Sequence, residues 1–95
     1  MLFRSDLSAA DYTIPGPGVY EITAGSVTYN LIFPNPANYV GAWLTIINTD
    51  GFNNVNFDNT NTFAPYDKGS GQLSGIDYKN AIHAISTGAK WINII

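Results

Sequence analysis

Apolar side chains recur at every second position in short blocks along this chain. In residues 27–33, the positions of Val27, Tyr29, Leu31 and Phe33 alternate with the remaining ones. This period of two is that of a β-strand with one buried face. The block is therefore expected to form a strand with these four side chains on the same side.

The other blocks indicate the same kind of structure. Residues 41–48 are almost entirely apolar, as expected of a central strand covered on both faces. Clusters of Gly, Pro, Asn and Asp separate the blocks at roughly ten-residue intervals. About seven or eight short strands with such spacing are typical of small all-β domains. We predict an all-β fold, a small antiparallel β-sandwich or a flattened, jelly-roll-like barrel.

The chain is long enough for one domain. Pro15-Gly-Pro-Gly18 joins residues that fix φ to residues that allow positive φ, so a turn is expected there. Residues 1–17 are predicted to form an N-terminal arm or a short first element, and residues 18–95 a single β-domain. A core of this size leaves a small stability margin. Because the chain has no cysteine, association with copies or a partner is the additional stabiliser we expect.

Residues 81–95 have the pattern of a closing hairpin. Two apolar blocks flank a turn that requires positive φ at Gly88. In the second block, alternation places Trp91 on one face and Ile92 on the other, so both faces of the last strand are apolar. One small sheet is not expected to cover both faces, and we therefore predict a contact between subunits. The predicted interface consists of Trp91, Ile92, Ile94, Ile95 and Trp43.

The charge content argues against several partners. Charged residues make up 12% of the chain, about half of the usual quarter, and the net charge is −3. Four Lys and Arg residues in all are too few for a phosphate-backbone site, so no nucleic acid is expected. No apolar run reaches the ~20 residues of a spanning helix, so no membrane contact is expected. The first residues lack the basic and apolar regions of a signal peptide.

Candidate catalytic or metal-binding residues are few. His83 is the only histidine, and a zinc site would need carboxylates from scattered loops. A packed or surface histidine is the simpler interpretation, and a pH-responsive role at a subunit contact is the alternative. The carboxylates mostly stand beside Gly, Asn or Ser at predicted turns, where Asp bonds its own backbone. We therefore expect no enzyme activity, no metal and no cofactor.

The aromatic residues are more informative. Most fall in predicted strands, where aromatic side chains usually belong to the core. Tyr39, Tyr66 and Tyr78 lie in or beside predicted loops. These three are the candidates for exposed contacts, either with a neighbouring protein or with a sugar ring.

Four segments together resemble a known group of proteins. They are Gly18-Val-Tyr-Glu-Ile22, residues 27–34, residues 41–49 and the closing hairpin, residues 81–94. This order resembles the small β-domains of tailed-phage virion proteins, among them head-fibre, tail-fibre and capsid-decorating modules. The group usually has Asp or Asn before the turn glycine, whereas this chain has Thr87. The resemblance covers about residues 18–95, and it implies a homotrimer.

The resemblance implies a non-enzymatic structural protein of the virion. It would act by protein–protein binding, as a homotrimeric capsid-decorating or head-fibre module whose partners are its own copies and the major capsid protein or another virion protein. If the chain is a whole gene product, its length favours decoration or a fibre base over a complete tail fibre. Two alternatives stay open: a receptor-binding tail-fibre tip that grips a host surface glycan, and a secreted carbohydrate-binding β-sandwich.

Overall fold

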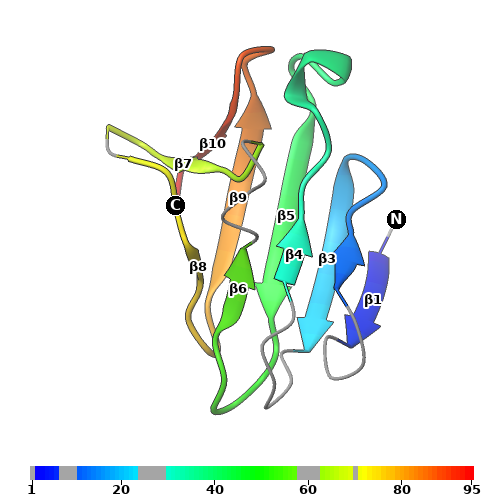
Figure 1. Cartoon of the computed structure of the whole chain (residues 1–95), viewed down its shortest axis with the longest axis vertical. Coiled ribbons are helices and arrows are strands. Elements are labelled where there is room, and N and C mark those ends of the chain that lie inside the picture. The colour runs from blue at the N-terminus through cyan, green and yellow to red at the C-terminus, as the bar shows by residue number, and fades with distance from the viewer. Residues whose placement is uncertain (1, 7–10, 24–29, 58–62, 70) are drawn as a thin grey trace.

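The computed structural model describes residues 2–6, 11–23, 30–57, 63–69 and 71–95 (Figure 1). Within them the chain is built of strands and one short 3₁₀ helix, η1 (Pro36–Asn38). The predicted all-β class is therefore confirmed. The strands are β1 (Leu2–Asp6), β2 (Tyr12–Thr13), β3 (Gly18–Thr23), β4 (Asn30–Ile32), β5 (Trp43–Asn48), β6 (Val55–Phe57), β7 (Tyr66–Asp67), β8 (Gly75–Ile76), β9 (Ala81–Ser86) and β10 (Trp91–Asn93).

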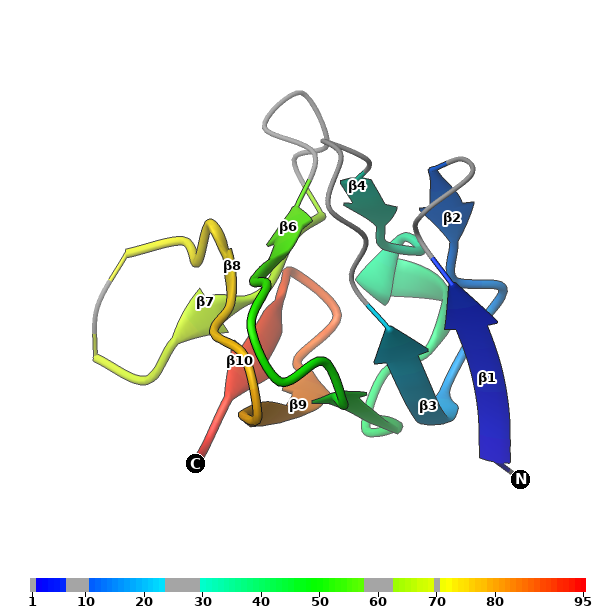
Figure 2. The same cartoon turned by 90° about the horizontal axis from the view of Figure 1, so that it is seen from below.

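These strands form two open sheets that lie face to face (Figure 2). Sheet A has the order β1-β3-β5-β9-β10-β7, and sheet B has the order β2-β4-β6-β8. Both sheets have free edges, so the described residues form no closed barrel. The residues predicted to be an arm supply β1 and β2, which pair in parallel with β3 and β4.

The chain winds as a coil between the two sheets. From β1 to β6, successive strands alternate between sheet A and sheet B, and all neighbours within this part pair in parallel. This is the winding of a short β-solenoid. The predicted antiparallel arrangement is thus wrong for this half of the molecule. Alternation shows which side chains share a face, but it does not show the direction of the neighbouring strand.

The C-terminal half reverses direction and closes the stack. β9 runs antiparallel to β5, β10 returns antiparallel to β9, and β8 runs antiparallel to β6. The predicted closing hairpin is confirmed, and Gly88 in its turn has φ +90°. The sheets are therefore mixed. In sheet A the pairing is parallel from β1 to β5, antiparallel from β5 to β10, and parallel again between β10 and β7; in sheet B it is parallel from β2 to β6 and antiparallel between β6 and β8.

The core lies between the inner faces of the two sheets. Phe33 and Phe57 meet there edge to face, with ring centroids 4.8 Å apart. Of the block predicted to alternate, Leu31 and Phe33 are buried as expected, while Val27 and Tyr29 lie outside the described residues. Other buried core side chains are Ile14, Tyr20, Ile22, Leu44, Ile46, Val55, Ala64, Ile76, Ile82, Ala84 and Trp91.

β5 only partly matches its prediction. It is central in sheet A, between β3 and β9. Its inner face carries the buried Leu44 and Ile46, but Trp43 on its outer face is 42% exposed. In the part of the chain that the structure describes, this strand is covered on one face and not on two. The apolar residues of its second face require another explanation.

Candidate functional site

The outer face of sheet A is unusually apolar. Burial alternates along β3, β5 and β9, so every second side chain of these strands points away from sheet B. Val19 is 36% exposed, Trp43 42% and Ile94 41%, and the other apolar members are half-buried. We call the following residues the outer apolar face: Val19, Trp43, Ile47, Ile85, Ile92 and Ile94.

Strand register makes one row of this face continuous, whereas Val19 and Ile47 pair across β3 and β5 with Thr45 and Glu21. Trp43 pairs with Ile85, Ile85 pairs with Ile92, and Ile92 pairs with Tyr66. One row of large side chains thus crosses β5, β9, β10 and β7. The amide of Ile94 donates to the carbonyl of His83, which continues the β9–β10 ladder by one more residue. Residues from four strands therefore contribute to a single surface.

His83 belongs to the same surface. Its ring stacks on Trp43 with centroids 4.3 Å apart and an interplanar angle of 7°. Its Nδ1 lies 2.6 Å from Oγ1 of Thr45, a hydrogen bond whose donor depends on the imidazole tautomer. The half-buried ring is thus held on two sides by neighbouring side chains. This geometry agrees with a packed surface histidine, and it fixes the orientation of Trp43.

The structure corrects the assignment of Trp91 to a subunit interface. The Trp91 side chain is 0% exposed, its Nε1 donates to the carbonyl of Pro34 at 2.9 Å, and its ring stacks on Tyr39. It fills the core of its own chain and is not available to a partner. Alternation separated the two faces of β10 correctly, but only the second sheet decides which face is inside.

The other predicted interface residues lie in two places. Trp43, Ile92 and Ile94 are on the outer apolar face, where a subunit contact stays a prediction. Ile95 is 62% exposed and lies instead at the edge of the molecule, beside a cleft between β7 and β8.

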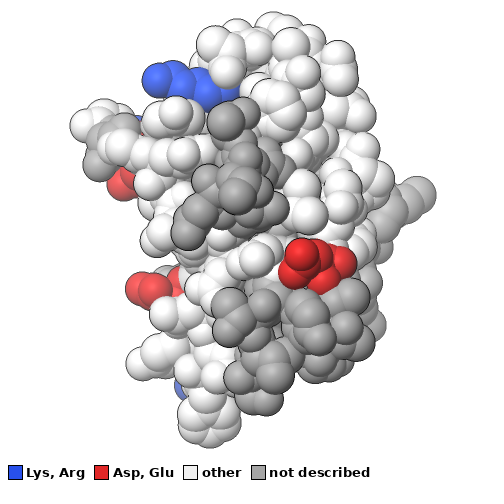
Figure 3. Space-filling model, in the orientation of Figure 1, with Lys and Arg blue, Asp and Glu red and all other residues white. Residues whose placement is uncertain are grey.

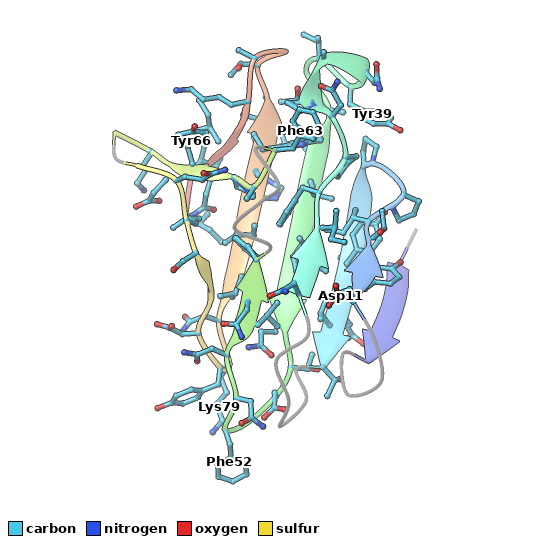
Figure 4. All side chains as sticks on the ribbon, viewed as in Figure 1. Asp11, Tyr39, Phe52, Phe63, Tyr66 and Lys79 are labelled. Carbon is cyan, nitrogen blue, oxygen red and sulfur yellow. The ribbon has the colours of Figure 1, made fainter. Side chains whose placement is uncertain are left out.

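The three candidate tyrosines do not form one site. Tyr39 packs against the core and donates to the carbonyl of Pro15, while the ring of Tyr66 carries the Lys90 ammonium 4.6 Å from its centroid. Figure 4 shows Tyr39 and Tyr66 on opposite sides of the molecule. Tyr78 is 50% exposed. Of the three, Tyr78 is the most available for an external contact.

A cleft at the β7–β8 edge was not indicated by the sequence. It has a volume of about 420 Å³ and opens between β8, β7 and the β9–β10 hairpin. Polar side chains contributed by separate segments line it, among them Asp67, Ser74, Asp77, Asn80 and Asn93. Their positions in the sequence have no regular spacing, so no motif could have revealed them. We call this feature the edge cleft.

Charged side chains are sparse and separated. On the side shown in Figure 3, acidic and basic atoms form small isolated groups, and acidic atoms emerge along the margin that β7 and β8 occupy in Figure 1. Hydrogen bonds from the backbone amides of Phe52 and Asn53 lower the pKa of Asp50, which closes the turn after β5. Burial raises the pKa of Tyr20, a core residue. Both groups serve the fold.

The described ranges contain neither a cluster of metal-ligating side chains nor a membrane-spanning helix. No three His, Asp or Glu side chains in these ranges come close enough together to hold a metal ion. No helix in the same ranges is long and apolar enough to cross a membrane.

Comparison with known protein families, with curated proteins and with solved structures yields no match. The resemblance to phage virion domains therefore stays a prediction from the sequence.

Proposed function

We propose that this domain is a non-enzymatic structural protein of a tailed-phage virion. It assembles as a homotrimer through the outer apolar face and binds the major capsid protein or another virion protein as a decorating or head-fibre module. The observation that supports assembly is the continuous row of large apolar side chains on a sheet face that no other described element covers. The phage assignment rests on the sequence resemblance alone.

The apolar row is unusual for an exposed sheet face. A sheet with one face in the core normally has polar side chains on the other, which gives a regular apolar–polar alternation. Here Ile85 and Ile92 face outward, while the residues next to them in the chain, Ala84 and Asn93, face inward. Single exposed apolar residues are common, but a contiguous group marks a contact surface. The small number of charges also limits repulsion between copies.

The free energy available from this face is modest. Removing the remaining exposed area of each half-exposed side chain contributes about 1 kcal/mol or less. Association costs several kcal/mol in lost translational and rotational freedom, about 4 kcal/mol or more. Several residues must therefore act together, and one buried charge in the row should be enough to prevent assembly. Symmetric repetition of the contact in a trimer adds avidity.

The first experiment measures oligomeric mass. We expect the wild-type domain to be a trimer by light scattering coupled to size exclusion at micromolar concentration, and Ile92→Lys to be a folded monomer. The matched control is Phe52→Lys, because Phe52 is 89% exposed on a loop at the far end of the molecule (Figure 4). A monomeric wild type, or a trimer that survives Ile92→Lys, contradicts the assembly proposal.

A second experiment concerns the virion. The proposed module should co-sediment with phage capsids or fibres and should not bind host cells. A receptor-binding tip would show the reverse, and a secreted carbohydrate-binding module would be a monomer that binds neither capsids nor fibres.

A further inference from the structure

We propose that the edge cleft binds one neutral or amino-substituted sugar ring. This site is separate from the proposed assembly surface, because it lies at the β7–β8 edge and includes no residue of the outer apolar face. Its volume of about 420 Å³ falls in the range of small-molecule sites, about 300–1,000 Å³. Its shape, its lining and its charge each restrict the kind of ligand that it can bind.

The lining of the cleft is mainly polar, with a smaller apolar part. Its half-exposed apolar side chain is Leu73, while Ile76 and Ile82 are buried core residues that expose very little surface to the cleft. Ser74 and Asn80 add groups that donate and accept hydrogen bonds. A pyranose ring has the same division, with C–H groups on its faces and hydroxyls around its edge. The cleft is therefore matched to a ring with a polar edge better than to a purely apolar ligand.

Asp67 is held in position by its neighbours. Its Oδ1 accepts from Nδ2 of Asn93 at 3.3 Å, and its backbone amide donates to the carbonyl of Gly71 at 3.0 Å. A carboxylate has about four lone-pair sites, so the Asn93 bond orients the group while using a small part of its capacity. Ligand hydroxyls can bond to the rest. Fixed acceptors of this kind reduce the entropy lost on binding.

Asn93 acts as a positioning residue. It is buried, its Oδ1 accepts from the amide of His83 at 2.9 Å, and its Nδ2 also donates to the carbonyl of Ile95 at 3.0 Å. Its amide thus ties β9, β10 and β7 together beneath the cleft. Asp67 and Asp77, by contrast, are the two groups whose oxygens are expected to meet the ligand.

The charge of the cleft restricts the ligand further. Asp67 and Asp77 line it, and no Lys or Arg is among its described lining residues. An anionic ligand would be repelled, whereas hydroxyl and ammonium donors are favoured. Since the described residues place no third carboxylate or imidazole nearby to complete a metal site, a donor-rich organic ligand fits the cleft better than a divalent cation.

The test compares three sugars that share a ring and differ in charge. Amide chemical shifts of the ¹⁵N-labelled domain are followed during titration with glucose, glucosamine and glucuronate. We expect millimolar binding of glucose (roughly −4 kcal/mol), with shifts confined to residues around the cleft. Glucosamine should bind about two- to fivefold tighter, as expected for an exposed ion pair. Glucuronate should cause no shifts.

Two variants and a control locate the site. Ser74→Trp places a large ring in the cleft and should abolish binding, while the Trp91 indole resonance reports that the fold is intact. Asp67→Asn keeps the shape and should reduce the preference for glucosamine, because only the Asp77 carboxylate then remains in the cleft. Asp11→Asn makes the same change at the opposite edge of sheet B, where Asp11 Oδ1 accepts from the amide of Asn30, and should bind as the wild type does (Figure 4).

Several outcomes would overturn the proposal. They are the absence of cleft shifts with all three sugars, equal binding of glucuronate and glucose, and binding that persists in Ser74→Trp. Shifts caused by Nα-acetyl-lysine methyl ester but by no sugar would assign the cleft to a cationic side chain of a protein partner instead. None of these results depends on oligomeric mass, so the sugar-binding proposal and the trimer proposal are tested independently.

Discussion

The two tryptophans of this chain occupy opposite faces of sheet A. Trp91 points inward and is fully buried, with its indole N–H bonded to Pro34 and its ring against Tyr39. Trp43 points outward, is 42% exposed and stacks on His83. The strands that carry them are equally apolar in sequence. The difference between core and surface is therefore set by the position of sheet B and not by the residues themselves.

The largest expected effect separates these two residues. Trp91→Ala should lower the free energy of unfolding by about 3–5 kcal/mol, because it leaves a large cavity and removes the bond to Pro34. Trp43→Ala should change the stability of the isolated chain by about 1 kcal/mol or less. Denaturation in urea at a protein concentration that favours monomer measures both. Equal losses would show that the outer face is as well covered as the core.

Polar residues on the two faces provide a second comparison. Asn48 is buried on the inner side, donates to the carbonyls of Asn53 and Ile76, and accepts from the amide of Asp50. Asn48→Ala leaves buried carbonyls without a donor and should cost about 2–3 kcal/mol. Thr45→Val on the outer face removes a hydroxyl next to His83 and should cost less than about 1 kcal/mol. Urea denaturation of both variants would contradict this if Thr45→Val were the more damaging.

The smallest expected effect concerns pH. The pKa of Asp50 is lowered by the backbone amides of Phe52 and Asn53, so its ionised form stabilises the folded state. That contribution is fully present above the ordinary carboxyl pKa of 3.8 and is lost as the pH falls through the lower folded value. The stability difference between wild type and Asp50→Asn should therefore shrink below about pH 4. Unfolding midpoints across pH 2–7 measure it, and a difference that does not change with pH would rule out this role.

Part of this structure could be predicted from sequence. Alternation correctly indicated the all-β class, the closing hairpin and the separation of Trp91 from Ile92, because each depends on residues close together in the chain. The parallel winding could not be predicted, since the direction of a neighbouring strand depends on how the chain crosses between sheets. The edge cleft was equally hidden, because Asp67, Asp77 and Asn93 meet only through the pairing of β7 with β10 and the placement of β8.

The coil from β1 to β6 has a consequence for how such a domain can change its length. Each turn of the coil contributes one strand to sheet A and one strand to sheet B, so the widths of the two sheets are coupled. An insertion that supplies a complete turn would lengthen the molecule while keeping its interior sealed. An insertion that supplies only one strand would extend one sheet past the other and expose a strip of interior to water. Growth in this architecture is therefore expected to proceed in whole turns.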